Sequence, residues 1–263
     1  MSPLTVSLIQ SYLHWEDKEK NLQQFETKIA SLPPATQLVV LPEMFSTGFS
    51  MKPEQLAETM DGPTVAWMKE QSGKHRKIIT GSIIAEEQGK YYNRLVWMLP
   101  NGTSYHYDKR HLFAYAGEDK HYTSGEKRLI VGVNGWKICL QVCYDLRFPV
   151  WARQKPSAEN GAEYDILIYV ANWPQRRSHP WKTLLQARAI ENQCYVIGVN
   201  RVGDDGNGIY HSGDSMLVDP TGDPLWHQSD EEATYTHTFQ PETLQKVRSH
   251  FPFLQDADNF LIL

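Results

Sequence analysis

Hydrophobic and polar residues recur with two periods in the first part of the chain, and both periods indicate secondary structure. Phe25, Ile29 and Leu32 are spaced as on one face of an amphipathic helix, which Pro33 and Pro34 end. A short, continuously apolar run follows, as in a strand that is buried on both faces. The pattern predicts strands at residues 5–10 and 37–43 and helices at residues 16–32 and 63–73.

Strand-like segments dominate the rest of the chain, and short turns join several of them. Asn101-Gly102 and Asn134-Gly135 are residue pairs that favour tight hairpins. The stretch 203–213 carries too many acidic residues to cradle a phosphate, and we interpret it as a hairpin or an exposed loop. Further strands are predicted at residues 77–87, 91–100, 103–109, 128–133, 136–145, 164–172, 194–202, 215–220 and 231–239, and further helices near 147–154 and at 180–193 and 241–250.

The order of these elements predicts an α/β protein. Strands and helices alternate at first, and strands then follow one another in hairpins. Roughly ten strands are too many for one small flat sheet, so we expect two mixed β-sheets packed face to face with outer helices. Because the chain has no evident repeat, linker or low-complexity tract, residues 1–263 are expected to form a single domain.

Composition excludes several classes of protein. Hydrophobic residues make up 41% of the chain and charged residues 22%, as in a globular protein. The net charge of −5 argues against non-specific nucleic-acid binding. No apolar run is long enough for a membrane span, and the N-terminus does not resemble a secretory signal. Three cysteines without a CxxC pair indicate reduced thiols and a cytoplasmic location.

Cys143 is the first candidate for chemistry. It lies where a predicted strand gives way to a turn, and Asp145 and Pro149 mark a helix start just beyond. Helix N–H groups at such a turn favour the thiolate, and a nucleophilic thiol also needs a nearby base or positive charge. From this segment alone, a small buried thiol is an equally good interpretation. We assign structural roles to Cys139 and Cys194.

Two further charged residues end predicted strands. Glu43 directly follows a fully apolar run, where a partly desolvated carboxylate suits a general base. Lys109 ends another strand and could direct its donors toward an oxyanion. Taken singly, each is more simply a surface residue. Together with Cys143 they place three reactive groups at strand ends, and active sites of α/β proteins gather at the carboxyl ends of strands.

The sequence resembles the nitrilase superfamily, the carbon–nitrogen hydrolases. Three motifs carry the resemblance: LPEMFSTGF around Glu43, YDKRHLF around Lys109 and CYDLRFP around Cys143. Further similarity lies in VANWP, in QARAIENQCYVIGVNR and in HSGDSMLVDPTGD. The motifs occur in order from about Thr5 to about Asp223, so the resemblance covers most of the chain.

The resemblance implies a fold and a set of roles. The fold is a four-layer αββα sandwich, commonly assembled into homodimers or larger homo-oligomers across the outer helices. Cys143 matches the family's nucleophile, Glu43 its general base and Lys109 its catalytic lysine. Glu118 matches a second glutamate beside the lysine, and the backbone N–H of Tyr144 would share the oxyanion with Lys109.

Within the family, the sequence looks most like the ω-amidase branch. Bacterial members of that branch hydrolyse the terminal amide of 2-oxoglutaramate and 2-oxosuccinamate to the 2-oxo acid and ammonia. The carboxylate of such a substrate requires cationic donors. Arg176, Arg177 and His179 follow the VANWP motif, and we expect Arg176 to bind the substrate. The predicted pocket walls are Phe113, Tyr144 and Trp173, with Tyr115 and Met44 as further candidates.

Other residues near these motifs are given structural roles. CYDLRFP is shared by branches with different substrates, so a structural role is expected for Arg147. His106 and His111 lie five residues apart on a predicted strand and therefore on opposite faces, which argues against a metal site. The chain contains no P-loop and no GxGxxG motif, and we expect neither a cofactor nor a metal.

Several alternatives stay open on the sequence alone. The chain could be another carbon–nitrogen hydrolase, acting on a carbamoyl-amine or on a deaminated glutathione amide. It could be a non-catalytic scaffold of the same fold, which the intact set of Glu43, Lys109 and Cys143 disfavours. A Cys–His hydrolase is a further alternative, although the sequence singles out no particular histidine as the catalytic partner. A thiol redox protein is disfavoured because Cys139, four strand residues from Cys143, is too far away for a disulfide.

Overall fold

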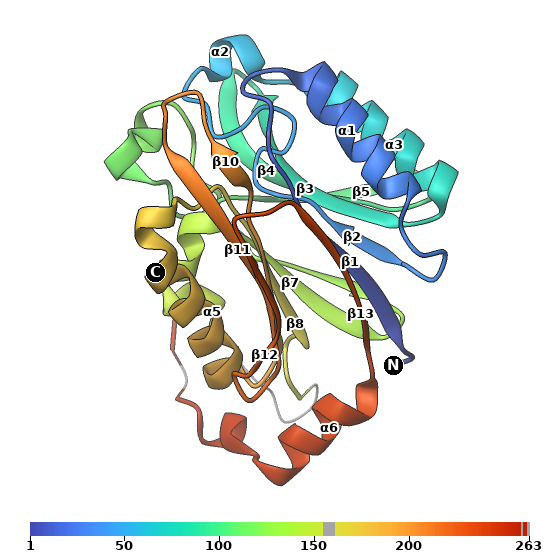
Figure 1. Ribbon diagram of the computed structural model, residues 1–263. Helices are drawn as coiled ribbons and strands as arrows, with labels where there is room; N and C mark the ends of the chain where they lie inside the picture. Colours follow the sequence, from blue (N-terminus) through green and yellow to red (C-terminus); the bar gives the residue numbers. More distant parts are fainter. Residues whose placement is uncertain (155–160, 259, 262–263) are drawn as a thin grey trace.

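The computed structural model describes residues 1–154, 161–258 and 260–261, and within them the strands form two β-sheets (Figure 1). The first sheet has six strands and the second seven among these described residues. The strands of the first sheet are β1 (Leu4–Gln10), β2 (Leu38–Val40), β3 (Ile78–Glu87), β4 (Lys90–Met98), β5 (Ser104–Asp108) and β13 (Ala233–Phe239). Those of the second are β6 (Leu129–Val133), β7 (Trp136–Val142), β8 (Ile166–Val170), β9 (Tyr195–Val199), β10 (Val202–Asp204), β11 (Tyr210–Val218) and β12 (Pro224–Ser229).

Each sheet is parallel at its centre and antiparallel toward its edges. The first runs β13-β1-β2-β3-β4-β5, with parallel pairs among β1, β2 and β3. The second runs β10-β11-β9-β8-β7-β6, with parallel pairs among β7, β8 and β9, and β12 pairs with β11. The first and the last strand of the chain pair in the first sheet, because β13 lies antiparallel to β1 (Figure 1).

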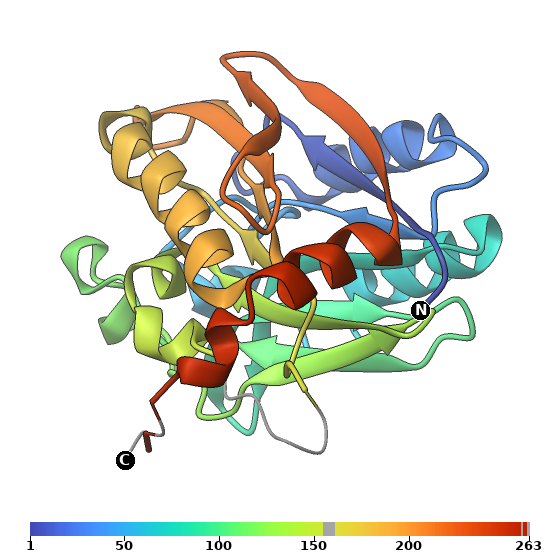
Figure 2. The same ribbon diagram turned by 90° about the horizontal axis from the view of Figure 1, so that it is seen from below.

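Helices cover the outer faces of both sheets. Figure 1 shows α1 and α3 together beside the first sheet and α5 beside the second, and α6 crosses one end of the molecule in Figure 2. The arrangement is the predicted four-layer αββα sandwich of two mixed sheets. The helices are α1 (Lys18–Ala30), α2 (Pro53–Leu56), α3 (Pro63–His75), α4 (Pro149–Ala152), α5 (Ser178–Asn192) and α6 (Pro241–His250).

Local sequence explains why these elements begin and end where they do. The Asp17 side chain accepts a hydrogen bond from the backbone N–H of Lys20 and caps α1, and Pro63 occupies the first turn of α3. The β6–β7 hairpin turns at Asn134 and Gly135, both with positive φ, as a two-residue type I′ turn requires. This turn sets the register of β7, the strand that Cys143 follows, against β6.

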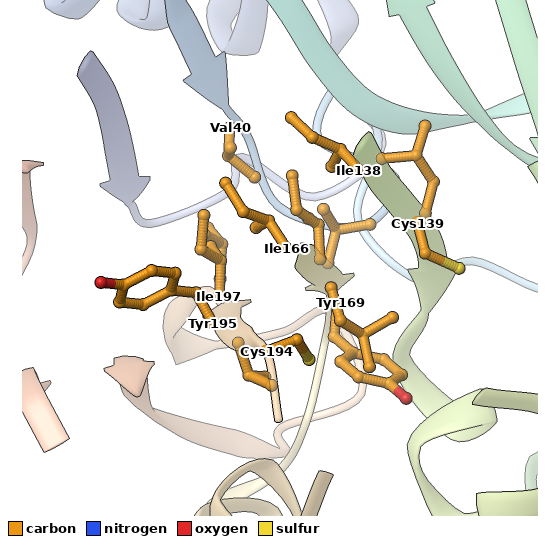
Figure 3. Packing of buried hydrophobic residues seen from close by; sticks show 14 of the residues in the cluster. Val40, Ile138, Cys139, Ile166, Tyr169, Cys194, Tyr195 and Ile197 are labelled. Atoms are coloured by element: carbon orange, nitrogen blue, oxygen red, sulfur yellow. The ribbon is translucent and has the colours of Figure 1, made fainter. Parts of the chain in front are cut away.

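The interior has separate apolar layers, one of which lies between the two sheets. In Figure 3, Val40 of β2 lies over Ile138 and Ile166 of the second sheet, and all three are fully buried. The thiol of Cys194 and the ring of Tyr169 point from the same sheet to its opposite face (Figure 3). Because both faces of this sheet are buried, its central strands consist mainly of apolar residues.

The structure corrects several predicted boundaries. The strand predicted at 37–43 ends at Val40, and the one predicted at 136–145 ends at Val142, where residues 143–147 form a 3-10 helix. Segment 194–202 divides into β9 and the start of β10, and 203–213 belongs largely to the β10–β11 hairpin. The helix near 147–154 is only the single turn α4. The sequence pattern did not predict α2 or β12.

Within the described residues, no helix is long and apolar enough to cross a membrane.

Candidate active site

The three sequence candidates converge at one end of the sandwich. Glu43 lies in the turn that follows β2, Lys109 directly follows β5, and Cys143 directly follows β7. The first two come from one sheet and the third from the other. The facing of the two sheets therefore brings together residues that are 66 and 34 positions apart in the sequence.

Lys109 is the centre of a buried charge cluster. Its Nζ lies 2.9 Å from Oε1 of Glu43 and 2.9 and 3.0 Å from the two carboxylate oxygens of Glu118. All three side chains are fully excluded from solvent. Burial alone would lower the pKa of Lys109, but the carboxylates of Glu118 and Glu43 outweigh it and raise the pKa. The lysine is therefore held as an ammonium ion.

Glu118 is bound from three sides. In addition to Lys109, its Oε2 accepts the backbone N–H of Phe113 at 2.6 Å, and its Oε1 accepts Nδ2 of Asn93 at 3.1 Å. Burial raises the pKa of Glu118, Lys109 opposes that rise, and the nearby charge of Glu43 adds to it. Glu118 thus ties the loop after β5 to the lysine.

Two asparagines complete the cluster, and the sequence analysis assigned neither of them. Asn93, in the middle of β4, donates to Oε1 of Glu43 at 2.7 Å, and its carbonyl accepts the backbone N–H of Lys109. Asn172, just after β8, donates its backbone N–H to Oε2 of Glu43 at 2.7 Å and its Nδ2 to the Glu43 carbonyl. Asn172 lies in the VANWP motif, but Asn93 is preceded by no turn or strand end that would mark it.

Cys143 is held in an unusual backbone conformation. Its φ is +44°, in the left-handed region that non-glycine residues rarely occupy, and the charge of Glu43 acts on its thiol. Burial raises the pKa of the Cys143 thiol, the charge of Glu43 raises it further, and Lys109 opposes both. The favourable effect of helix N–H groups on the thiolate stays a prediction. The raised pKa favours a protonated thiol, and the Glu43 carboxylate is placed to accept its proton.

The thiol faces a cavity of about 250 Å³ that is lined by both apolar and cationic residues. Phe113, Tyr144, Trp173 and Arg176 all line it, so the structure gathers every predicted substrate-binding residue around one space. Tyr115 lines it as well. Met44 does not line it and is buried in a separate cluster with Ile84 and Tyr122. The other lining residues are Phe49, Lys109, Ala116, Cys143, Arg147, Asn172, Pro174, Arg177, Asp205, Ile209 and His211.

Two further arginines, Arg147 and Arg177, line the cavity that the thiol faces. Arg147, expected to be structural, lines the cavity with its guanidinium 4.9 Å from the centre of the Trp173 ring. Arg177 lines it with its guanidinium 5.1 Å from the centre of the Phe113 ring. Planar guanidinium groups stack on aromatic faces in this way while their edges stay free to bind a carboxylate. His179, the third sequence candidate, is not among the lining residues.

Histidines near the site have other partners than a metal ion. Nδ1 of His111 lies 2.8 Å from a carboxylate oxygen of Asp145, within hydrogen-bond distance, and the His111 ring stacks on Phe148. His211, at the start of β11, is almost fully buried, and burial lowers its pKa to about 4. Across residues 1–154, 161–258 and 260–261, no group of three or more His, Cys, Asp or Glu side chains is arranged to hold a metal.

Comparison with known proteins agrees with this geometry. The Carbon-nitrogen hydrolase family matches residues 5–249. The chain is 43% identical to "Omega-amidase YafV" of Yersinia enterocolitica over 100% of both chains. It is 41% identical to the protein of that name in Escherichia coli (strain K12) over 99% of both. It is also 29% identical to "2-oxoglutaramate amidase" of Bacillus subtilis over 96% of both.

A solved structure supports the fold assignment. The CN-hydrolase superfamily protein XC1258 of Xanthomonas campestris, described with an arsenic adduct in its active site, matches with a TM-score of 0.98. It is 42% identical, and the match covers 100% of both chains. The chain therefore belongs to the carbon–nitrogen hydrolase family, and the predicted family and fold class are confirmed.

Proposed function

We propose that the protein hydrolyses the terminal amide of small 2-oxo acid amides, such as 2-oxoglutaramate and 2-oxosuccinamate, to the 2-oxo acid and ammonia. The observation that carries the proposal is a buried thiol near a carboxylate and a buried ammonium group, in a cavity that three arginines also line. Relatives with ω-amidase names that match the whole chain at 41–43% identity support this substrate class.

The first half of the reaction forms a thioester. Glu43 takes the proton of Cys143 while sulfur attacks the amide carbonyl carbon. The carbonyl oxygen becomes an oxyanion, which Lys109 and the backbone N–H of Tyr144 stabilise. Glu43 then gives its proton to the amide nitrogen, the C–N bond breaks and ammonia leaves. This sequence needs a base near the thiol, and Glu43 is close enough for its charge to act on the thiol.

The second half hydrolyses the thioester. Glu43, again ionised, takes a proton from water while the water oxygen attacks the thioester carbonyl. Lys109 and the N–H of Tyr144 stabilise the second oxyanion. The C–S bond then breaks, the thiolate takes back a proton from Glu43, and the 2-oxo acid departs. Glu118 and Asn93 act by holding Lys109 and Glu43 in fixed positions throughout.

The substrate carboxylate is assigned to the arginine-rich wall. The sequence pointed to Arg176 and Arg177 among its candidates, and the cavity adds Arg147. Burial lowers the pKa of Arg177, and the neighbouring charge of Arg176 lowers it further. An anion bound between them would offset this repulsion. We therefore propose that the three arginines bind the carboxylate, and that the aromatic rings of Phe113 and Trp173 orient two of them.

The proposal extends to domain organisation, cellular location and oligomeric state. We propose that residues 1–263 work as one domain, because one hydrophobic cluster contains residues of both sheets. Three buried, unpaired thiols support a cytoplasmic location. Exposed apolar side chains on and near the outer helices, Ile190 and Phe253 among them, support a homodimer. Light scattering of the purified chain would test the assembly.

The decisive experiment measures ammonia release from 2-oxoglutaramate by the wild-type protein and by Cys143→Ala. We expect Cys143→Ala to lose about 10⁴-fold or more in kcat. Cys194→Ala is the matched control, since Cys194 is a fully buried thiol outside the cavity lining, and it should keep the wild-type rate. Mass spectrometry after rapid mixing should find the acyl group on Cys143.

A substrate panel separates the alternatives. Turnover of a carbamoyl-amine or of deaminated glutathione, with none of the oxo-amide, would keep the mechanism and replace the substrate. A folded protein that releases no ammonia from any amide and forms no acyl adduct on Cys143 would establish the scaffold instead. Within the panel, Arg177→Ala should raise KM for 2-oxoglutaramate by roughly 10-fold or more while affecting an uncharged amide far less.

A further inference from the structure

Asp145 is a fully buried carboxylate that does not line the cavity and takes no part in the steps above. It lies two residues after the nucleophile in the CYDLRFP motif. Its Oδ2 accepts the backbone N–H of Val142 at 3.1 Å and the hydroxyl of Tyr107 at 2.8 Å. Its Oδ1 lies 2.9 Å from the backbone nitrogen of His111 and 2.8 Å from its Nδ1.

These partners flank the two residues that must act together. Val142 directly precedes Cys143, whereas Tyr107 and His111 stand two residues before and two residues after Lys109. The Cys143 turn follows β7 of the second sheet, and Lys109 follows β5 of the first. One carboxylate therefore connects the segment that carries the thiol to the segment that carries the ammonium group.

Additional contacts fix the geometry of this connection. The Tyr107 hydroxyl oxygen accepts Nε1 of Trp151 at 2.9 Å and the backbone N–H of Arg110 at 3.2 Å, so its proton is left for Asp145. The ring of His111 stacks on Phe148 with 3.8 Å between centroids and 7° between planes. Trp151 and Phe148 lie just beyond the nucleophile turn, so both contacts also join it to the lysine segment.

We propose that Asp145 is a positioning residue that sets the distance between the Cys143 thiol and the Lys109 ammonium group across the two sheets. The inference rests on the proposed roles of these two residues. Because the attacking sulfur and the oxyanion donor belong to different sheets, small shifts between the sheets change the reacting geometry. A misplacement of about 1 Å can cost roughly 10²-fold in rate.

The test begins with two variants. Asp145→Asn keeps the size of the side chain but presents an amide donor to neighbours that are themselves donors. We expect it to lose roughly 10²-fold in kcat with KM little changed. Should Asp145→Asn fold poorly, Tyr107→Phe tests the same connection by removing a single oxygen. It leaves the Val142 and His111 contacts in place and should lose roughly 10-fold in kcat.

Tyr164→Phe is the matched control. Tyr164 is also fully buried, and its hydroxyl donates to the carbonyl of Ala152, away from the cavity lining. Both phenylalanine variants remove a hydroxyl and the hydrogen bond that it donates, and Tyr107→Phe also removes the acceptor of Trp151 Nε1 and of the Arg110 N–H. We expect both variants to lose thermal stability, Tyr107→Phe more, but a loss in kcat only from Tyr107→Phe. Equal losses in kcat would assign Tyr107 a general structural role and overturn the proposal.

A second measurement does not depend on the substrate. The rate of Cys143 alkylation by iodoacetamide is followed against pH, with mass spectrometry separating Cys143 from Cys139 and Cys194. The charged groups that face the thiol are Glu43, Lys109, Glu118 and Arg177, and both phenylalanine variants retain all four. If Tyr107 keeps Lys109 close to the sulfur, Tyr107→Phe moves the alkylation midpoint to higher pH, and Tyr164→Phe does not.

The outcomes separate this inference from the proposed function. An unchanged kcat and an unchanged alkylation midpoint in Tyr107→Phe would refute the positioning role. A shifted midpoint in a protein that does not hydrolyse 2-oxoglutaramate would support the positioning role and reject only the substrate. Wild-type Cys143 reacting no faster than Cys139 and Cys194 would reject the nucleophile and, with it, this inference.

Discussion

Two groups of hydrogen-bonded residues in this molecule are each built around buried carboxylate groups, and they differ in what they can do. At the candidate active site, Glu43 and Glu118 share Lys109. On β11, Asp214 accepts hydrogen bonds from Ser212 at 2.6 Å, from Ser229 at 2.7 Å and from Nε2 of His227 at 2.8 Å. The second cluster contains the residue types of a serine hydrolase triad, but its geometry is not that of one.

The difference begins with the histidine. In a serine hydrolase, one imidazole nitrogen binds the carboxylate and the other binds the nucleophilic hydroxyl. Here the same nitrogen of His227 lies 2.8 Å from Asp214 and 3.4 Å from the hydroxyl of Ser229, whose proton already goes to Asp214. Residue types alone would suggest a hydrolase site, and the direction of each hydrogen bond excludes it.

The pKa values of the two clusters move in opposite directions. Burial would raise the pKa of Asp214, but the hydrogen bonds from Ser212, Ser229 and Ser178 outweigh it and lower the pKa. Burial raises the pKa of Glu118 despite Lys109. The Asp214 cluster is thus a saturated set of donors around one stable anion. The active-site cluster concentrates charge beside a cavity and leaves one group, the Cys143 thiol, ready to react.

Among the variants that test this comparison, Lys109→Met should have the largest effect. It removes the oxyanion donor and leaves Glu43 and Glu118 buried without a cation. We expect a loss of about 10³-fold or more in kcat and of about 3–5 kcal/mol in the free energy of unfolding. Buried carboxylates with raised pKa values favour the folded state at low pH and lose that contribution as pH rises. The loss, measured by urea unfolding, should therefore be larger at about pH 8 than at about pH 5.

Lys77→Met is the matched control for this prediction. Lys77 is also buried, but its Nζ donates to the carbonyl oxygens of Pro33 and Thr36 rather than to carboxylates. The variant should keep its activity and lack the alkaline loss of stability. An equal pH dependence in both variants would show that the Glu43 and Glu118 charges are not its cause.

Asp214→Asn should have the next largest effect and should separate the two clusters. The substitution keeps the shape of the side chain, and asparagine tolerates the positive φ of +56° at this position. We expect a loss of about 1–3 kcal/mol in unfolding free energy at neutral pH and a kcat close to that of the wild type. Loss of turnover without loss of stability would assign this cluster to the active site.

The pH dependence of Asp214→Asn should be opposite to that of Lys109→Met. A carboxylate with a lowered pKa stabilises the folded state above its unfolded pKa, and that contribution is lost as pH falls through its folded pKa. The stability difference between the wild type and Asp214→Asn should therefore shrink below about pH 4. Thermal unfolding followed by circular dichroism at several pH values would measure it.

Ser229→Ala should have the smallest effect. It removes one of several donors to Asp214, so about 1 kcal/mol or less of unfolding free energy should be lost and kcat should not change. A loss as large as that of Asp214→Asn would show that Ser229 alone, rather than a saturated set of donors, holds the carboxylate.

The sequence located the active-site residues that end strands better than those that lie within them. Glu43, Lys109 and Cys143 follow apolar runs, and the boundary between an apolar and a polar segment is visible in the pattern. Asn93 lies inside β4, and only the turn after β2 and the loop after β5 bring it two carboxylate partners, Glu43 and Glu118. Such a contact depends on pairing between strands, which no local pattern records.

Two residues lie in surroundings that their local sequence did not indicate, for a similar reason. Arg147 was interpreted from its motif, but the aromatic ring on which it stacks, Trp173, lies at the end of another strand. His111 was placed on a strand face, but β5 ends at Asp108, so alternation no longer applies and the side chain meets Asp145. The hairpin option for residues 203–213 was correct, but the burial of His211 against the cavity depends on the packing of two sheets.

Because the backbone at Cys143 is left-handed, the residue that replaces Cys143 in an inactive variant affects the stability of the protein. Alanine at a φ of +44° keeps a Cβ in the conformation that disfavours it, whereas glycine adopts that conformation freely. Cys143→Gly should therefore be the more stable of the two inactive variants, by about 1 kcal/mol. A catalytic sulfur requires a side chain at a position where the fold would be more stable with none, so reactivity and stability select different residues here.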